Sequence, residues 1–477
     1  MSDCYDNDKP ANGQYDLAVI GAGSAGFSAA ITAADEGAQV AVIGYGTIGG
    51  TCVNVGCVPS KALIRAAESL HAASAAERFD GIEVQAKVTD WSAMVKQKQD
   101  LVDDLRKAKY IDILPAYNSI AYLEGKASFA DDGALKVDGK PINAKKIIIA
   151  TGTRPALPSI EGIEDVPFLD STTALEQETL PESMIVIGAG YIGAEIAQIF
   201  ARAGVKVTIV SRRGLLPEAE PEIGEALTGY FADEGISIVK GITYDRIEQI
   251  GNSVHLHLNS PKGAKVITAE KVMIASGRTP NTDQLNLKAA GIDIAGNQGI
   301  IVDPQMRTTR DNVYAAGDVT GNDQFVYMAA YGAKIAAKNA LNSNSLSYDN
   351  SVMPAVVFTD PQVASVGYTE AQARAAGFDV KTSILTLDNV PRALAARDTR
   401  GLFKLIADAK TKKLLGAHIL APEGSDSIQT AALAIKAGMT YEELGSMIFP
   451  YLTTVEGLKL AAQTFDMDVK KLSCCAG

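Results

Sequence analysis

The chain has 477 residues, with 44 Lys and Arg against 56 Asp and Glu, so its formal net charge is −12 at neutral pH. This acidic balance argues against a nucleic-acid-binding protein, because such proteins draw much of their affinity from cationic side chains on phosphates. Hydrophobic residues make up 47% and charged residues 21% of the chain. This composition is typical of a globular protein with roughly two to four domains and excludes a disordered or collagen-like chain.

The N-terminal segment carries Asp3, Asp6 and Asp8 where a secretory signal peptide would show a basic start and an apolar run. The most apolar stretch, residues 184–210, is interrupted by charged side chains and glycines, so no unbroken apolar run of about 20 residues occurs. We therefore expect a cytoplasmic protein without a membrane span.

Two segments show the order strand, glycine turn, helix, strand that is typical of a nucleotide-binding βαβ unit. The first comprises residues 15–20, a turn from Gly21, residues 24–36 and residues 39–43. The second comprises residues 184–187, a turn from Gly188, residues 194–203 and residues 206–210. The sequence therefore predicts an α/β fold with two Rossmann-like nucleotide-binding domains.

Two further apolar strands, residues 146–152 and 271–277, end in small residues and would return the chain to these domains. From about Ser351 the pattern changes to strand-like runs and then to helical periodicity, which predicts a third, C-terminal α+β domain. The expected strands are residues 355–358 and 402–406, and the expected helices are residues 428–437 and 455–462. The polar tail from Phe465 onward gives no strand or helix signal.

The first glycine turn, Gly21, Gly23 and Gly26, follows a strand and opens a helix, where glycines permit a pyrophosphate to approach the helix N-terminus. The acidic residue that usually ends the second strand and binds the ribose is missing, because Ile43 is followed by Gly44. Ribose recognition at this turn must therefore differ from the usual hydrogen bond.

The second glycine turn has the same context, and its second strand ends in a serine and two arginines instead of an acid. Guanidinium groups suit a 2′-phosphate, so NADPH is favoured over NADH. The alternative is that the arginines are only a solvated surface pair. The residues concerned are Gly188, Gly190, Gly193, Ser211, Arg212 and Arg213.

The five cysteines are too few for a disulfide framework in a chain of this size. Cys52 and Cys57 are five residues apart, a spacing that does not share one face of a regular helix. Gly56 and Pro59 would permit a distortion that brings the two sulfur atoms together, and a helix N-terminus would lower a thiol pKa. A redox pair is favoured over a structural zinc half-site, because the chain has only four histidines.

The segment from Gly49 to Lys61 resembles the active-site segment of the flavin disulfide oxidoreductases, and the resemblance extends over nearly the whole chain. It implies that Cys52 and Cys57 form a redox-active disulfide, with Cys57 nearer the flavin. It also implies that FAD binds at the first glycine turn and NADPH at the second. Further FAD-binding positions implied by the family's motifs are Gly50, Thr51, Lys61, Thr151, Gly152 and Asp318. Lys61 would stabilise negative charge beside the flavin and pair with Glu195 near the nicotinamide.

The C-terminal domain departs from the members that act on dithiol substrates, which carry a histidine as general base. Tyr451 stands at that position here, although the accompanying acid, Glu456, remains. A phenol that titrates near ~10 cannot replace an imidazole that titrates near ~6.5 in deprotonating a thiol at neutral pH. The sequence therefore argues against thiol–disulfide exchange with an organic substrate.

The chain ends with adjacent thiols, Cys474 and Cys475, on a polar tail, and soft thiolates select soft metal ions. Together with Tyr451, this pair makes the chain resemble the mercuric reductases within the family, and Tyr110 matches their second active-site tyrosine. The resemblance implies reduction of Hg(II), brought by small thiols, to volatile Hg(0). The partner subunit's Cys474 and the partner subunit's Cys475 would capture the ion and pass it to the other cysteine pair, Cys52 and Cys57. The functional unit would be a homodimer.

The resemblance also implies a domain organisation. The FAD-binding domain would comprise residues 1–155 and 280–350, the NADPH-binding domain residues 156–279, and the dimerisation domain residues 351–477. Many mercuric reductases carry an extra N-terminal metal-binding domain, whereas this chain has only Cys4 near its start, which we interpret as a bystander thiol.

Two other functions remain open. An enzyme of the same fold that reduces an organic disulfide would turn over lipoamide or glutathione disulfide, against the evidence of Tyr451. A metal-sequestering protein would bind Hg(II) stoichiometrically without consuming NADPH. Gly44 keeps the second alternative open, because weak FAD binding would abolish turnover.

Overall fold

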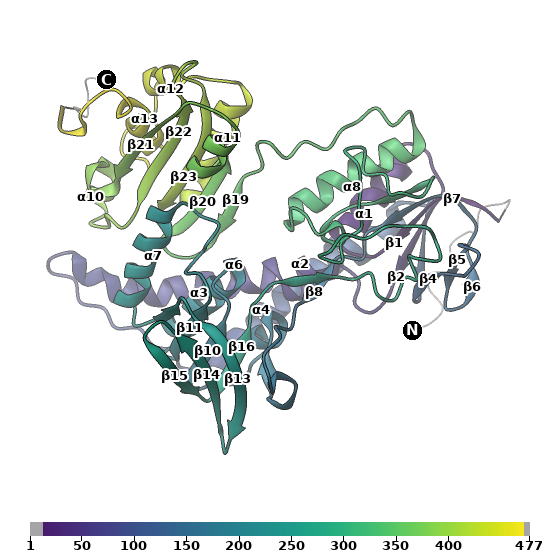
Figure 1. Ribbon diagram of the computed structural model, residues 1–477, viewed down its shortest axis with the longest axis horizontal. Helices are drawn as coiled ribbons and strands as arrows, with labels where there is room; N and C mark the ends of the chain where they lie inside the picture. The colour runs from purple at the N-terminus through teal and green to yellow at the C-terminus, as the bar shows by residue number, and fades with distance from the viewer. Residues whose placement is uncertain (1–12, 472–477) are drawn as a thin grey trace. The chain divides into compact units, whose positions relative to one another are not determined.

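The computed structural model describes residues 13–471, which form two compact units (Figure 1). The first unit comprises residues 13–60, 95–156 and 277–349, and the second comprises residues 61–94, 157–276 and 350–471. Two helices, α3 (Cys57–Ser74) and α4 (Trp91–Arg106), begin in one unit and end in the other. The three-domain boundaries expected from the sequence stay a prediction.

The first unit is built on a parallel five-stranded sheet with the strand order β18-β7-β1-β2-β3. Its central strands are almost continuously apolar because both faces of the sheet are covered. Helices α1 and α8 lie side by side on one face (Figure 1). The elements are β1 (Tyr15–Ile20), α1 (Ser24–Asp35), β2 (Val40–Gly44), β3 (Ile120–Glu124), β7 (Ala144–Ile149), β18 (Val313–Ala315) and α8 (Val326–Leu341).

The opposite face of this sheet is covered by a small antiparallel sheet and by the chain segment around residues 285–300. The small sheet comprises β4 (Ala127–Phe129), β5 (Leu135–Val137) and β6 (Lys140–Pro141). A two-stranded ribbon of β8 (Thr153–Pro155) and β17 (Arg278–Pro280) lies where the chain leaves and re-enters the unit.

The second unit contains another parallel sheet, with the order β12-β11-β10-β16-β9. Helices pack against it, and an antiparallel meander, β13-β14-β15, buries apolar side chains against the sheet strands. The elements are β9 (Phe168–Leu169), α5 (Ser171–Leu175), β10 (Ser183–Ile187), α6 (Tyr191–Arg202), β11 (Lys206–Ser211), α7 (Pro221–Asp233), β12 (Ser237–Lys240), β13 (Thr243–Ile250), β14 (Ser253–Ser260), β15 (Gly263–Ala269) and β16 (Lys271–Ile274).

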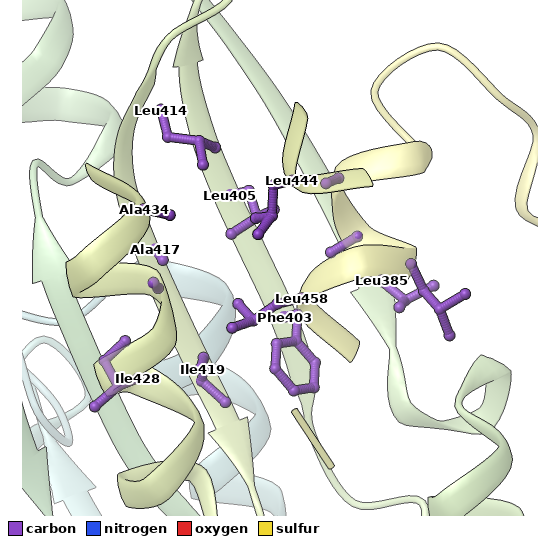
Figure 2. Close-up of a cluster of buried hydrophobic side chains, with 14 of the residues drawn as sticks. Leu385, Phe403, Leu405, Leu414, Ala417, Ile419, Ile428, Ala434, Leu444 and Leu458 are labelled. Carbon is purple, nitrogen blue, oxygen red and sulfur yellow. The ribbon is translucent and has the colours of Figure 1, made fainter. Parts of the chain in front are cut away.

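The C-terminal part of this unit is an antiparallel sheet, β19-β20-β23-β22-β21, covered by helices. Figure 2 shows its core, in which the ring of Phe403 lies beside Leu458 and Ile419. A Cβ atom on Gly457 would lie 2.3 Å from this ring, so α13 approaches the sheet closely only because residue 457 is glycine. The elements are β19 (Ala355–Val357), β20 (Gln362–Gly367), α9 (Glu370–Ala375), β21 (Val380–Thr386), α10 (Pro391–Ala395), β22 (Leu402–Asp408), β23 (Leu414–Ala421), α11 (Gly424–Lys436), α12 (Tyr441–Ser446) and α13 (Glu456–Gln463).

The predicted α/β fold class, two parallel sheets of the Rossmann-like type followed by a C-terminal α+β domain with an antiparallel sheet, is confirmed. The expected strands and helices occur with ends shifted by a few residues. The tail differs slightly from the prediction, because a short 3₁₀ turn forms at Val469–Lys471 where no element was expected.

A charged cluster within the second unit makes its stability sensitive to acid. Burial raises the pKa of Asp398, but hydrogen bonds and positive charge from Arg400, with help from Arg78, outweigh it and lower the pKa to about 2. Because the folded-state pKa is depressed, this carboxylate stabilises the fold above the usual carboxyl range and the contribution disappears as the pH falls toward 2.

The Asp398→Asn variant should therefore lose about 2 kcal/mol of unfolding free energy near neutral pH, and the difference from the parent should shrink below pH ~4. Urea unfolding at several pH values would measure the difference. A constant difference across this range would show that Asp398 keeps an ordinary pKa in the folded state.

Candidate active site

The first glycine turn lies between β1 and α1 and leaves the helix N-terminus open. No side chain caps α1 at Gly23, so the backbone N–H groups of its first turn face outward for an anion. A Cβ on Gly21 would lie 2.2 Å from the carbonyl oxygen of Ala150, and one on Gly26 would lie 1.8 Å from that of Gly21. Both glycines are therefore required by close backbone contacts.

The backbone of the segment that carries the cysteines packs directly against the backbone of this turn. A Cβ on Gly50 would lie only 2.6 Å from the Cα of Gly23, and Gly50 has a positive φ of 67°. Thr51 is exposed in the first turn of α2 (Gly50–Val55). The start of α2 thus lies directly against the nucleotide turn.

The helix that contains the cysteines is broken between them. Cys52 lies in α2, Gly56 interrupts the helix with φ −125° and ψ −109°, and Cys57 is the first residue of α3. A Cβ on Gly56 would lie 2.9 Å from the carbonyl oxygen of Thr51, which explains why a glycine stands at the break. Both thiols are partly buried. Each lies near a helix N-terminus, a position that favours a thiolate anion.

Tyr110 lies beside this pair, in a π-helical turn (Lys107–Ile111) that directly follows α4. Its hydroxyl is 3.1 Å from the Oγ of Ser24 in the glycine turn, and its ring packs edge-on against Phe27. Burial raises the pKa of the Tyr110 hydroxyl, the hydrogen bond with Ser24 lowers it, and the charges of Cys52 and Cys57 raise it further. The phenol therefore stays protonated at neutral pH, within electrostatic range of both sulfur atoms.

An ion pair forms between the half-buried Lys61, one turn after Cys57 in α3, and the buried Glu195 in α6. The Nζ of Lys61 lies 2.7 Å from Oε2 of Glu195, while the backbone N–H of Phe358 donates to Oε1 at 2.9 Å. The Nζ also lies 4.7 Å from the centre of the Phe358 ring. Both carboxylate oxygens are thus engaged, and the ammonium group is held in one place while remaining partly accessible.

Asp318 lies at the start of a 3₁₀ turn that follows β18. Burial raises the pKa of its carboxyl group, whereas a hydrogen bond from Thr153 and the charge of Arg278 lower it. Thr153 donates to Asp318 at 3.0 Å and in turn accepts from Arg278 at 2.7 Å. The neighbouring turn of Thr151 and Gly152 is tied by hydrogen bonds to Asn281.

The second glycine turn repeats the geometry of the first. A Cβ on Gly188 would lie 2.2 Å from the carbonyl oxygen of Ala275, and one on Gly193 would lie 2.2 Å from that of Gly188. Gly190 precedes α6 without a side-chain cap and has open space around it. The N-terminus of α6 is therefore also available to a pyrophosphate.

The candidate ligands for the 2′-phosphate lie at the end of β11. Ser211 is buried and its hydroxyl is engaged with the backbone of Arg213 and Gly214. Arg213 is exposed and pairs with Glu218 at 2.6 Å. Arg212 is exposed and makes no ion pair with any residue between 13 and 471, so its guanidinium group is the more available of the two.

We expect Arg212→Ala to raise the KM for NADPH by about tenfold to a hundredfold, because a charge-assisted hydrogen bond to the 2′-phosphate is lost. The KM for NADH should change little. Steady-state kinetics with both nucleotides would measure this, with Arg213→Ala as the matched control and a smaller expected effect. An equal effect on both nucleotides would contradict a role for Arg212 in phosphate recognition.

The C-terminal candidates lie in the antiparallel-sheet domain of the second unit. Tyr451 is 51% exposed, and Glu456 is buried at the start of α13, where it accepts a hydrogen bond from the backbone N–H of Leu452 at 3.2 Å. Burial raises the pKa of Glu456, opposed by this hydrogen bond and by the charge of Lys459. Cys474 and Cys475, like Cys4, lie outside the described residues.

Comparison with known proteins decides the family. Residues 15–337 match the model of the pyridine nucleotide-disulphide oxidoreductases, and residues 353–462 match the model of that family's dimerisation domain. The chain belongs to this family. It is 47% identical over 464 residues to a mercuric reductase of Lysinibacillus sphaericus, covering 97% of this chain and 85% of the relative. It is 45% identical to a mercuric reductase of Streptomyces lividans, covering 97% of this chain and 98% of the relative.

A similar solved structure is the Cu(II) complex of the HOCl-induced flavoprotein disulfide reductase RclA from Escherichia coli. It has a TM-score of 0.84 and 33% sequence identity and covers 94% of this chain and 99% of the other. The chain is therefore similar both to proteins named for mercury and to a protein solved with copper.

Members of this oxidoreductase family use FAD and NADPH, and the residues of this chain fit both. The first glycine turn offers a helix N-terminus that no side chain caps, together with close glycine contacts, for a pyrophosphate. Asp318 offers a partly buried carboxylate for the hydroxyl groups of the ribityl chain. The second turn and Arg212 offer the same kind of cradle, with a cation, for NADPH.

Several contributors to this oxidoreductase site had no signal in the sequence. Thr153 and Arg278 surround Asp318, and Phe358 binds Glu195, but each of these residues is far along the chain from its partner. Asn54 braces the cysteine segment by donating to the carbonyl oxygens of Ile48 and Gly50 at 2.9 Å. Only Asn54 could have been suspected, because it lies between the two cysteines.

Within residues 13–471, no three His, Cys, Asp or Glu side chains gather in an arrangement that would hold a metal ion. Of the four proposed mercury ligands, only Cys52 and Cys57 belong to this range. None of the helices in the same range is long and apolar enough to cross a membrane.

Proposed function

We propose that this chain reduces Hg(II) to volatile Hg(0) with electrons from NADPH. The balanced reaction is NADPH plus Hg²⁺ giving NADP⁺, H⁺ and Hg(0), since the hydride carries both electrons. The proposal rests chiefly on one observation: the Cys52/Cys57 pair spans a helix break against a nucleotide turn. Mercuric reductases that are 45 to 47% identical over nearly the full chain support the choice of metal.

In this mechanism the chain's own residues position the reactants. The N-termini of α1 and α6 would hold the two pyrophosphates, and Arg212 would hold the 2′-phosphate of NADPH. Glu195 fixes the ammonium group of Lys61, which would stabilise negative charge at the redox centre. When bound, FAD supplies the two-electron relay between the nicotinamide and the cysteine side of the site.

The cysteine thiolates hold and transfer the metal. Thiolate–Hg(II) bonds are so strong that the ion would move by ligand exchange between thiol pairs instead of free dissociation. The partner subunit's Cys474 and the partner subunit's Cys475 receive Hg(II) from small thiols in this proposal and pass it to Cys52 and Cys57. The match of residues 353–462 to the dimerisation domain supports a homodimer as the functional unit.

We place this reaction in the cytoplasm. It consumes NADPH and depends on four cysteines that must be able to act as thiolates. Cytosolic glutathione and thioredoxin keep such thiols reduced.

The proposal is tested by NADPH oxidation on purified holoenzyme with Hg(II) and excess small thiol, together with detection of Hg(0) vapour. We expect NADPH consumption that depends on Hg(II) and releases vapour. Under limiting thiol, Cys474→Ala/Cys475→Ala should lose this activity. Hg(II) binding without NADPH use would favour a sequestering protein, and turnover of lipoamide or glutathione disulfide would favour an organic disulfide reductase.

The two tyrosines are expected to ease metal transfer as hydrogen-bond donors or weak ligands. Tyr110→Phe should therefore slow Hg(II)-dependent turnover by about threefold to tenfold, the effect of losing one hydrogen bond, while flavin reduction by NADPH stays fast. Tyr451→Phe should act in the same direction. Stopped-flow absorbance separates the two steps, and an equal loss in flavin reduction would place the tyrosines in cofactor binding instead.

A further inference from the structure

The first nucleotide turn lacks the acid that normally binds the adenosine ribose, because β2 ends at Gly44. In such folds the ribose lies outside the carboxyl end of this strand, where its hydroxyl groups need a polar partner from the protein. Because the rest of the turn fits FAD, another side chain of this protein should bind the ribose hydroxyl groups.

The structure explains why residue 44 carries no side chain. A Cβ atom on Gly44 would lie 2.3 Å from the hydroxyl oxygen of Tyr122, 2.8 Å from its Cζ and 2.9 Å from the Cβ of Ala22. Real Cβ atoms essentially never approach another heavy atom this closely. An acid at position 44 and a tyrosine at position 122 therefore exclude each other in this arrangement.

Tyr122 comes from the neighbouring strand β3, where it pairs with Val42 of β2. Its ring packs, half-buried, in the same apolar cluster as Ala22 of the glycine turn. The ring thus reaches along the sheet to the end of β2, and its hydroxyl lies over Gly44, beside the turn that faces the pyrophosphate.

The hydroxyl group is suited to donate a hydrogen bond to a ligand. Within the part of the chain that the structure describes, it makes no hydrogen bond to another residue, and it is not among the buried unsatisfied atoms. Burial and the negative charge of Glu124 both raise the pKa of Tyr122, so the phenol is neutral at physiological pH.

We propose that the Tyr122 hydroxyl binds a hydroxyl group of the adenosine ribose of FAD and so replaces the acid missing from position 44. This inference rests on the proposed function, because it assumes FAD at the first glycine turn. A specific partner for the ribose removes the reason for expecting weak FAD binding from Gly44.

The test measures the dissociation constant of FAD for the apoprotein by quenching of flavin fluorescence. Tyr122→Phe keeps the ring that fills the space over Gly44 and removes only the hydroxyl. We expect it to weaken FAD binding by about threefold to tenfold. Tyr117→Phe is the matched control, because Tyr117 is a half-buried tyrosine of the same cluster, and it should leave the dissociation constant unchanged.

FAD analogues that lack the 2′- or the 3′-hydroxyl of the adenosine ribose locate the contact. The analogue that lacks the contacted hydroxyl should bind the parent more weakly than FAD does. Tyr122→Phe should not weaken the binding of this analogue any further. If Tyr122→Phe binds FAD as tightly as the parent, or weakens FAD and both analogues equally, the ribose contact is refuted. An apoprotein that binds no FAD at all would instead refute the proposed function.

A second pair of variants tests the mutual exclusion. Gly44→Glu should weaken FAD binding, because its side chain collides with Tyr122. The double variant Gly44→Glu/Tyr122→Val should recover part of the affinity, because it removes the two closest contacts of a Cβ at position 44, leaves only the one with the Cβ of Ala22, and supplies a carboxylate. If the single and double variants bind FAD equally, Tyr122 does not occupy the position that the acid would need.

Discussion

Cys57→Ser should abolish Hg(II) reduction, with kcat/KM lowered by about a thousandfold or more, because a hydroxyl group at this position can neither ligate Hg(II) as a thiolate nor exchange electrons. Cys57 begins α3 directly after the helix break, so serine fits the same backbone and the fold should persist. Hg(0) release and Hg(II)-dependent NADPH oxidation measure the loss. Cys52→Ser should have a loss of similar size.

Two controls make this result specific. The FAD content and melting temperature of Cys57→Ser should match those of the parent, because neither glycine turn is altered. Cys4→Ser should keep full activity, since we interpret Cys4 as a bystander. Substantial vapour release by Cys57→Ser would show that another thiol pair holds the metal during reduction.

The parts of the site that could be predicted are those whose chemistry is local in the sequence. A glycine turn needs small residues at fixed short spacing, and the contacts of Gly21, Gly26 and Gly188 confirm that a side chain at any of them would collide with backbone. The cysteine segment was also partly predictable, because Gly56 and Pro59 were expected to permit a local distortion; the structure breaks the helix at Gly56, whereas Pro59 lies within α3.

The parts that could not be predicted depend on residues brought together by the fold. Thr153 lies beside Asp318 and Arg278 in the fold, although it is 165 positions from Asp318 and 125 positions from Arg278 in the sequence. Neither spacing follows from a periodicity. The π-helical turn that holds Tyr110 likewise has no signal, so the ordinary helical pattern of α4 hid the position of that side chain.

Gly44 combines a feature that the sequence shows with an explanation that only the fold supplies. The absence of an acid was plain in the sequence, but its explanation was not, because Tyr122 lies on another strand, β3, and helices α2, α3 and α4 intervene in the chain. Register decides the matter: β2 and β3 pair in parallel so that Tyr122 reaches the end of β2. A departure from a family motif can therefore indicate a compensating side chain that only the fold locates.

The largest stability effect is expected from Lys404, a lysine in β22 whose side chain is 2% exposed. Its Nζ lies 2.8 Å from Glu220, 2.9 Å from Glu222 and 3.0 Å from Glu370. Burial lowers the pKa of Lys404, but the hydrogen bonds that its ammonium group donates to these three carboxylates raise it more, so the group is charged in the folded protein. This stabilising contribution is fully present below the ordinary pKa range of lysine as long as the three glutamates are ionised.

Lys404→Met should lower the free energy of unfolding by about 3–5 kcal/mol, because it leaves the buried carboxylate of Glu220 without its cation. Urea unfolding measures the change, and Lys412→Met is the control. Lys412 pairs with Glu442 where both side chains are about half exposed, so its loss should cost less than about 1 kcal/mol. If the two variants were equally stable, the carboxylates around Lys404 would have to be hydrated in solution. Glu220 and Glu222 lie at the start of α7, whereas Lys404 lies in the C-terminal sheet. A large loss of unfolding free energy in Lys404→Met, with a small loss in Lys412→Met, would therefore show that this cation stabilises the packing of α7 against that sheet.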